Sequence, residues 1–495
     1  MTAPPLPHRL AVLAAAILCF SATVSFDFVY DDFWVVVGNR FLGRPSAWVS
    51  LLDGRALGWG VPDAARPLAV LSAALDHAVF GAWAGGHHAT SILLHAGVVA
   101  LVLRLASALG LGARASIAAG AFFALAPVHA EAVAVVSYRE DLLATLLVLA
   151  ALDAALRDRP LLAATLALFA PLAKESAITA PALAVVVGII ARPVPRRGLA
   201  ALCAGTGLWL AWRLATVGLS AYGPAVAARP SLALHAPQTI AEAFGRSLVP
   251  LGFSPAHAPP QGSTGAILGA LALAALLAVA AVVRRRVPLA TLGLTFFVVA
   301  MLPTANLLAM PVPRAERFAY LPSVGTALAI GAIAAQLDRL LAPRVLALGG
   351  LSACAALWVT SAIACRPYRS DDTLWRAAAA ASPTSARAQA GLARTLRMAG
   401  DPTGAASALA RALALDPRDP AAQVVAAVQA YEHKRYEESL RALDRAAELG
   451  VVPAWQVPRN RAVVLLASGK RELAERELAA CQRRHPFIDC REGIR

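Results

Sequence analysis

Long apolar segments, separated by short basic ones, occupy the first three quarters of the chain. About 20 apolar residues in a helix cross the roughly 30 Å of a membrane interior, and polar ends that snorkel allow fewer. We count eleven such segments and predict eleven spanning helices. They are residues 10–26, 89–109, 115–136, 141–156, 160–173, 176–192, 198–219, 264–283, 287–308, 321–341 and 345–365.

The last quarter of the chain repeats small and large residues at intervals of 34 or 35 positions. A period near 34 is typical of tetratricopeptide repeats, in which helix pairs stack and present a groove to extended peptides. The pattern predicts three repeats, at residues 386–417, 420–451 and 455–486, with a binding role. The repeating positions are Ala405, Leu409 and Ala412 in the first repeat, Ser439, Leu443 and Ala446 in the second, and Ala474, Leu478 and Cys481 in the third.

Charge divides the chain at the same place. Hydrophobic residues make up 58% of the chain and charged residues 15%, which excludes an ordinary soluble enzyme. Residues 370–495 hold 15 acids and 19 bases, whereas the longer part before them holds 15 acids and 26 bases. We therefore predict an all-α protein with a membrane domain at 1–369 and a repeat domain at 370–495, joined near Arg366–Arg369.

Arginines indicate the orientation, since cytoplasmic loops are enriched in basic residues. Placing the N-terminus in the cytoplasm puts every short arginine-rich loop inside, and an odd number of spans then puts the repeats outside. Phe26-Asp27-Phe28 is no small-residue cleavage site, so 10–26 is predicted as a retained span. We expect a multi-pass inner (plasma) membrane protein of a bacterium with periplasmic repeats. The inner-loop arginines are Arg9, Arg114, Arg157, Arg159, Arg192, Arg196, Arg197, Arg284, Arg285, Arg286, Arg339 and Arg344.

Acidic residues of the membrane domain gather on the predicted outer side, where twelve of its 15 acids fall. Ionisable groups near a membrane interior are costly and mark function. Asp31 and Asp32 follow the first span, where paired carboxylates serve to take a proton or hold a divalent metal. A solvated turn that ends the helix is the alternative interpretation.

Two further outer segments concentrate ionisable residues. If residues 127–143 are helical, Glu131 and Tyr138 share one face, with His129 and Arg139 nearby. Lys174 is the only lysine before the repeats and suits a phosphate contact, the alternative being an interfacial pair with Glu175.

Arginines follow the ninth predicted span on the outer side. Arg314 and Arg317 flank Glu316 and are spaced to clamp a phosphate, the alternative being a juxtamembrane arginine pair. His87, His88 and His95 are spaced to share a helix face but complete no known metal-ligand spacing, so we predict hydrogen-bonded interfacial histidines, the alternative being a metal-binding face. Of six cysteines, only Cys481 and Cys490 are candidates to pair.

Together these segments resemble, in identity and order, the transmembrane-and-tetratricopeptide O-mannosyltransferase family, whose members have the GT-C glycosyltransferase fold. The resemblance runs from about residue 26 to the end of the repeats. Its motifs are Tyr30-Asp31-Asp32 with Asn39, Arg66-Pro67-Leu68, His88 with His95, Pro127 to Val133, Arg139 to Leu143, Lys174-Glu175 and Ala315 to Ser323.

The resemblance implies an inverting transfer of a sugar, mannose in this family, from a polyprenyl-phosphate lipid to a hydroxyl of an exported polypeptide bound by the repeats. Asp31 and Asp32 are the implied catalytic residues, and no cofactor is implied with certainty, although a divalent metal is compatible. Two other interpretations stay open, namely a lipid or envelope-glycan acceptor and a non-catalytic membrane scaffold. The implied donor-binding and substrate-binding residues are Arg66, His129, Glu131, Arg139, Lys174, Glu316, Arg317 and Tyr320.

Overall fold

The computed structural model describes residues 4–218, 231–450, 453–491 and 494, and within these ranges the chain forms helices and no strand. Every predicted apolar segment coincides with helix. Residue 219 of the segment 198–219 and residue 451 of the second repeat lie outside the described residues. The helices at these segments are α1 (Leu6–Phe20), α4 (Ala84–Ala108), α5 (Ala113–Leu125), α7 (Arg139–Leu156), α8 (Pro160–Ala173), α9 (Ala180–Ile190), α10 (Arg196–Thr216), α13 (Ser263–Val283), α14 (Pro288–Met301), α15 (Ser323–Leu340) and α16 (Pro343–Cys365).

Fewer of these helices are long and apolar enough to cross a membrane on their own. By length and composition, five in the described part of the chain qualify, or six if the bent pair Ala113–Leu125 and Pro127–Ala134 is one span. The remaining segments form shorter helices, such as α8, or carry several ionisable residues, such as α7. The count of eleven spans therefore stays a prediction.

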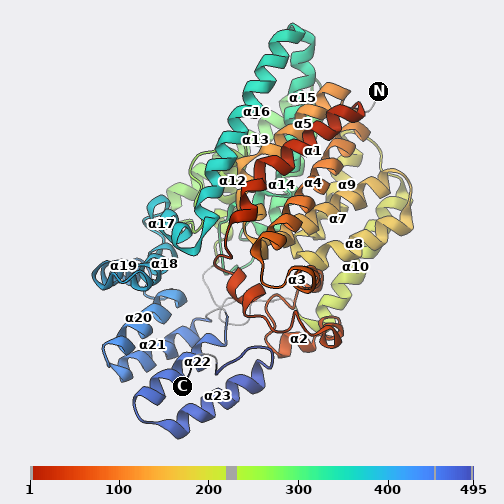
Figure 1. Cartoon of the computed structure of the whole chain (residues 1–495). Coiled ribbons are helices and arrows are strands. Elements are labelled where there is room, and N and C mark those ends of the chain that lie inside the picture. The colour runs from red at the N-terminus through yellow and green to blue at the C-terminus, as the bar shows by residue number, and fades with distance from the viewer. Residues whose placement is uncertain (1–3, 219–230, 451–452, 492–493, 495) are drawn as a thin grey trace.

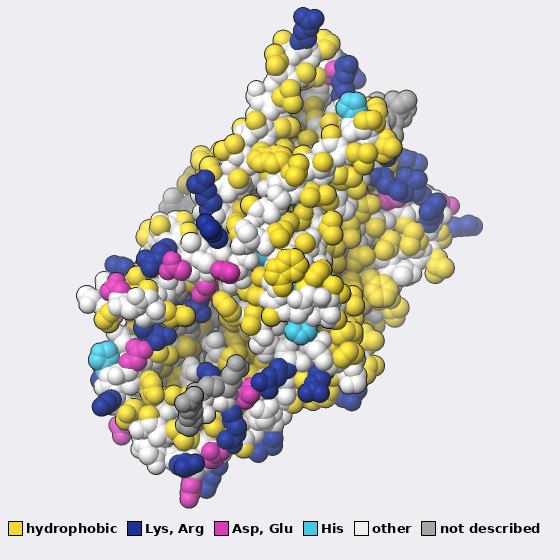
Figure 2. Space-filling model, in the orientation of Figure 1, with side chains coloured by type: hydrophobic (Ala, Val, Ile, Leu, Met, Phe, Trp, Pro, Cys, Tyr) yellow, Lys and Arg dark blue, Asp and Glu magenta, His cyan; other side chains and the backbone are white. Residues whose placement is uncertain are grey.

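The apolar helices pack into one elongated bundle, and the N-terminal end of α1 lies at the end far from the C-terminal helices (Figure 1). Hydrophobic side chains cover most of the bundle's visible face, whereas acidic and basic side chains gather over the C-terminal helices (Figure 2). α14 and α15 cross closely at Gly293 and Gly325, where a Cβ on either glycine would lie within 2.4 Å of the other's carbonyl oxygen. Such small-residue crossings allow helices to pack in a membrane without a hydrophobic driving force. Shorter helices between the spans are α2 (Arg55–Gly58), α3 (Pro67–Phe80), α6 (Ala130–Ala134) and α12 (Ala236–Leu248).

Three helix pairs follow the bundle at the positions predicted for the repeats. They are preceded by α17 (Asp371–Ala381), an additional helix that the repeat pattern did not predict. The Ser370 side chain caps α17 directly after α16 and a short turn at Arg366–Arg369, so the predicted linker is short and helical. The pairs are α18 (Ala386–Met398) with α19 (Pro402–Leu415), α20 (Pro420–Glu432) with α21 (Tyr436–Glu448), and α22 (Gln456–Ala467) with α23 (Arg471–Arg484).

The segment after α23 returns to the first outer loop, and a disulfide between Cys481 and Cys490 closes it. Phe487 packs between the rings of Phe41 and Trp59, with ring centroids 5.1 and 5.4 Å away. Arg40 donates its backbone N–H to the Phe487 carbonyl oxygen at 3.2 Å. Residues 485–489 thus contact residues 40–60 of the first outer loop.

We expect Cys490→Ser to lower the free energy of unfolding of the repeat region by about 2–4 kcal/mol, because the unfolded chain regains the freedom that the disulfide removes. Thermal unfolding under non-reducing conditions measures the loss. Cys203→Ser is the control, because Cys203 is exposed and unpaired. Equal melting temperatures for Cys490→Ser and the wild-type protein would contradict the expectation.

Candidate functional site

Acidic and basic side chains from distant parts of the sequence meet at the repeat-facing end of the bundle. We call this group the outer cluster; four of its members are basic and six are acidic. It is joined by ion pairs, by hydrogen bonds and by the rings of Tyr138 and Phe318. Its members are Asp31, Asp63, Arg66, Glu131, Glu140, Asp141, Lys174, Glu175, Arg213 and Arg317.

A broken helix supplies two of the central residues. After α5, the chain turns at Pro127, forms α6 and becomes extended at Val135, with φ −105° and ψ 118°, before the turn that leads to α7. The prediction that Glu131 and Tyr138 share one continuous helical face is therefore wrong, because the helix is interrupted between them. Both side chains nevertheless contact Arg317, which they reach from the two sides of the break.

A linked series of contacts runs from Glu131 to Asp31. The Arg317 guanidinium forms an ion pair with Glu131, and the Arg317 backbone N–H donates to the same carboxylate at 2.9 Å. The guanidinium carbon lies 3.8 Å from the centre of the Tyr138 ring. The Tyr138 hydroxyl donates to Asp31 Oδ2 at 3.0 Å. Asp31 is thereby held beside a buried cation that it does not contact directly, and the residue as a whole remains partly exposed.

Lys174 and Arg66 form the second half of the outer cluster. Lys174 Nζ lies 2.5 Å from Asp141 Oδ2 and 3.0 Å from Glu140 Oε1. Arg66 pairs with Glu140 and, at 2.9 Å, with Glu175 Oε2. The halves meet at Phe318, whose ring centre lies 5.0 Å from the Arg317 guanidinium and 5.4 Å from Lys174 Nζ.

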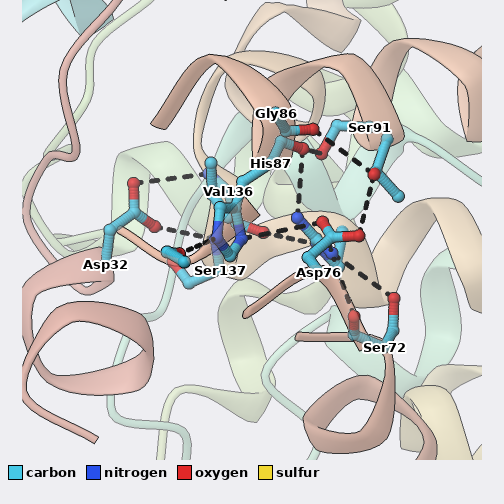
Figure 3. Close-up of polar contacts among 11 residues, drawn as sticks. Asp32, Ser72, Asp76, Gly86, His87, Ser91, Val136 and Ser137 are labelled. Atoms are coloured by element: carbon cyan, nitrogen blue, oxygen red, sulfur yellow. Dashed lines mark hydrogen bonds and ion pairs between the residues drawn. The ribbon is translucent and has the colours of Figure 1, made fainter. Parts of the chain in front are cut away.

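Asp32 differs sharply from its neighbour. Its side chain is completely buried and accepts the backbone N–H groups of Val29 at 3.1 Å, Val136 at 3.4 Å and Ser137 at 2.7 Å. Figure 3 shows the carboxylate facing Val136 and Ser137. These bonds fix the turn that precedes α7, so the geometry gives Asp32 the position of an anchor for the loop that carries Asp31.

Arg139 lies apart from the outer cluster. It donates to Asp76 Oδ2 at 2.5 Å and to the His87 carbonyl oxygen at 3.1 Å. Figure 3 shows Asp76 close to Ser72 and His87. The predicted donor-phosphate contact of Arg139 would require breaking this buried pair. The structure therefore separates Arg139 from Arg317 and Lys174.

Three other predicted residues lie deeper in the bundle or beside it. Tyr320 and His129 are completely buried, where Tyr320 bonds to His95 Nδ1 at 2.7 Å and His129 bonds to Ser323 Oγ at 2.8 Å. Glu316 lies 2.5 Å from His257 Nε2 and accepts the Ser254 backbone N–H at 3.2 Å.

The two arginines of the predicted phosphate clamp diverge. Arg314 pairs with Glu242 at 2.5 Å, whereas Arg317 pairs with Glu131. The spacing of three residues therefore does not bring both guanidinium groups to one position, because the intervening chain is a short turn whose side chains point to different partners.

Burial raises the pKa values of two acids in the first outer loop. Burial raises the pKa of Asp31 to about 8, although the nearby Arg317 guanidinium and the Tyr138 hydroxyl favour the ionised form. Burial also raises the pKa of Asp63 to about 6, against the attraction of Arg66. A carboxyl group whose pKa lies near neutral pH can exchange a proton under physiological conditions, as a general base must.

One N–H donor in the outer cluster is available to bind an anion. Among the described residues, Arg317 Nε is buried without a hydrogen-bond partner. Buried N–H groups without a partner are uncommon in proteins, and a phosphate oxygen would satisfy this one. Within the same residues, no group of three or more His, Cys, Asp or Glu side chains is placed to hold a metal ion.

Three residues of this region were not predicted individually as site residues. Arg213, near the end of the apolar helix α10, pairs with Glu175 at 3.2 Å. A single arginine inside a predicted span is a sign of function, and this rule would have identified Arg213. Asp63 and Asp76 were predicted only as two of the twelve acids on the outer side, because they lie in an irregular loop and in a short helix whose fold the sequence pattern does not determine.

Known proteins similar to this chain are protein O-mannosyl-transferases. Over 135 residues it is 36% identical to protein O-mannosyl-transferase Tmtc2 of Drosophila melanogaster, covering 26% of this chain and 14% of that protein. Over 162 residues it is 33% identical to human protein O-mannosyl-transferase TMTC4, covering 29% and 22%. Over 207 residues it is 32% identical to Drosophila melanogaster protein O-mannosyl-transferase Tmtc1, covering 39% and 24%.

These similarities confirm the resemblance to the transmembrane-and-tetratricopeptide O-mannosyltransferases that the motif series indicates. Each matched stretch spans less than a quarter of the relative's length. No protein-family model matches the chain.

Proposed function

We propose that this protein is a membrane glycosyltransferase that moves a sugar, mannose, from a polyprenyl-phosphate donor to a hydroxyl group of an exported polypeptide. The observation that carries the proposal is the linked series from Asp31 through Tyr138 to Arg317. It places the carboxyl group of a partly exposed residue, with a pKa of about 8, beside a buried guanidinium that has an unsatisfied N–H. The names of the similar proteins support the same activity.

In the proposed reaction, Asp31 accepts the proton of the acceptor hydroxyl as its oxygen attacks the anomeric carbon of the sugar. The bond between that carbon and the phosphate oxygen breaks, polyprenyl phosphate leaves, and the configuration at the anomeric carbon inverts. Arg317 and Lys174 stabilise the negative charge that develops on the leaving phosphate, an effect that is usually large because the charges are held in place beforehand. Asp32 holds the loop, and Arg66 fixes Glu140 and Glu175 around Lys174.

The location and the acceptor belong to the same proposal. We place the outer cluster and the repeats on the periplasmic side of a bacterial inner membrane, with the N-terminus in the cytoplasm. The Cys481–Cys490 disulfide supports an oxidising compartment for the repeats, since disulfides persist mainly outside the cytosol. The C-terminal region adjoins the loop that carries Asp31 through α17 and through Arg387 of the first predicted repeat, as expected of a domain that delivers a polypeptide to it.

The test is direct transfer by the full-length protein in lipid nanodiscs. Radiolabelled polyprenyl-phosphate-mannose is the donor, and an unfolded serine- and threonine-rich polypeptide is offered beside a lipid alcohol. We expect label on the polypeptide that β-elimination releases, because elimination removes sugars linked through serine or threonine oxygen. A matched reaction with polyprenyl-phosphate-glucose reports the choice of sugar.

The other outcomes distinguish the alternative functions. Label only on the lipid alcohol would replace the polypeptide acceptor with a lipid or envelope glycan. Failure of every donor and acceptor pair, with intact protein, would leave the repeats as a membrane-anchored scaffold and contradict the proposed enzyme.

A further inference from the structure

Tyr30, which immediately precedes Asp31, has an unusual backbone conformation. Its φ of +49° lies in the left-handed region, which bulky residues rarely adopt. A strained conformation of this kind persists only where surrounding contacts hold it, and such residues concentrate at functional sites. The contacts that hold Tyr30 therefore also control where Asp31 lies.

Those contacts come from the beginning of the C-terminal region. The Tyr30 backbone N–H donates to Asp371 Oδ1 at 3.1 Å, and the Trp375 ring meets the Tyr30 ring edge to face at 5.2 Å. The Arg387 guanidinium carbon lies 5.1 Å from the centre of the Tyr30 ring. We call Asp371 and Trp375 of α17 and Arg387 of α18 the Tyr30 clamp.

The clamp is itself rigidly built. Trp375 Nε1 donates to Asp371 Oδ1 at 3.1 Å, and Arg394 of α18 pairs with the other oxygen of the same carboxylate. On the membrane side, the Asp27 backbone N–H donates to the Arg369 carbonyl oxygen at 3.1 Å. The segment between the first span and Asp31 is thus bound to the C-terminal region at Asp27 and at Tyr30.

Two polar groups at the clamp make no hydrogen bond within the described part of the chain. The Arg387 guanidinium is partly exposed and is attracted by Asp419, and the Tyr30 hydroxyl is buried without a partner. A guanidinium carries five N–H donors, and a polypeptide backbone carries one carbonyl acceptor per residue. A polypeptide that passes along α18 toward Asp31 would supply carbonyl acceptors to the partly exposed Arg387 guanidinium.

We infer that α17 and α18 position Asp31 for its acceptor: Tyr30 is a positioning residue held by Asp371 and Trp375, and Arg387 binds the backbone of the acceptor polypeptide next to the hydroxyl that is modified. This inference rests on the proposed transfer to polypeptides. The inference predicts that binding of a polypeptide along α18 affects the position of Asp31, because Arg387 of the clamp would contact the polypeptide and already contacts Tyr30.

The kinetic test separates the two roles by using a long polypeptide acceptor and a short alcohol acceptor that has no peptide backbone. We expect Arg387→Ala to raise KM about tenfold for the long acceptor and to leave KM for the short one unchanged, since one charged hydrogen bond is lost. We expect Asp371→Ala to lower kcat about tenfold for both acceptors and to alter the pH profile of transfer. Arg418→Ala is the matched control, because Arg418 is an exposed arginine of the same region outside the clamp.

A second measurement does not depend on turnover. Hydrogen exchange of residues 27–34 is expected to become faster in Asp371→Ala, and in the milder Asp371→Asn, than in Arg418→Ala. Equal KM changes for both acceptors in Arg387→Ala would overturn the binding role. Unchanged exchange and an unchanged pH profile in both Asp371 variants would overturn the positioning role. Absence of transfer by the wild-type protein would contradict the proposed function alone, because exchange still decides whether the clamp holds Asp31.

Discussion

Replacing Asp31 with asparagine is expected to lower kcat for sugar transfer by about 10²–10⁴-fold, the usual contribution of a general base, while KM for the lipid donor changes little. Asparagine keeps the shape of the side chain and a hydrogen-bond acceptor for Tyr138, but it cannot take a proton. The measurement is transfer from a polyprenyl-phosphate donor by the full-length protein in nanodiscs.

Asp53→Asn is the matched control for Asp31→Asn, because Asp53 lies on the same outer loop but is exposed, and among the described residues it pairs with Arg55 alone. Asp32→Asn is expected to lower the melting temperature instead, because it disturbs the three hydrogen bonds that the Asp32 carboxylate accepts from backbone N–H groups. Unchanged turnover in Asp31→Asn would exclude Asp31 as the base.

The pH profile follows from the same residue. A general base acts when it has lost its proton, so transfer is expected to rise with pH and to level off above the Asp31 pKa of about 8. Tyr138→Phe removes a hydrogen bond that favours the ionised carboxylate, so the pKa rises and the rising limb moves to higher pH. A profile that is flat between pH 6 and 9 in the wild-type protein would argue against this role.

The largest expected effect on stability belongs to the Glu131–Arg317 ion pair. Removing one partner leaves the other buried without a partner, so Glu131→Leu or Arg317→Met is expected to cost about 3–5 kcal/mol of unfolding free energy. The double variant is expected to lose about 2 kcal/mol less than the sum of the single losses, because the residues are in direct contact. Thermal unfolding in detergent micelles and transfer assays measure the two consequences.

Transfer distinguishes support of the fold from a role in the reaction. The double variant is expected to regain stability without regaining transfer, because Arg317 is the cation beside Asp31. Arg114→Met is the control, since the Arg114–Asp338 pair is largely exposed and is expected to contribute no more than about 1 kcal/mol. Recovery of transfer in the double variant would show that Arg317 acts only through folding.

Local pattern accounts for what could be predicted of the fold. Apolar runs predict helices because a backbone in hydrocarbon must satisfy its own hydrogen bonds, and each of the eleven runs coincides with helix. The 34-residue period likewise placed all three helix pairs, because each pair is a unit whose small and large residues meet its neighbours. Length alone did not decide how many helices cross, since breaks such as the one at Pro127 shorten them.

Partners across the fold account for what could not be predicted. Arg139 and Arg317 look equivalent in the sequence, yet Arg139 is held by Asp76 and Arg317 by Glu131. Asp31 and Asp32 are adjacent, yet only Asp31 is left partly open, because the backbone of the turn at Val136–Ser137 takes both oxygens of Asp32. No periodicity records such choices, since they depend on contacts between residues 63 to 186 positions apart.

By itself, the sequence determined the helical elements, the division into an apolar and a charged region, and the gathering of acids at one end of the apolar region, because these depend on composition and on neighbours along the chain. Only the tertiary structure decided which acids and bases pair, that Asp31 is the accessible carboxylate, and that α17 and α18 hold the loop that carries it. The physical reason is that the energy of a buried charge depends on the groups that surround it in space.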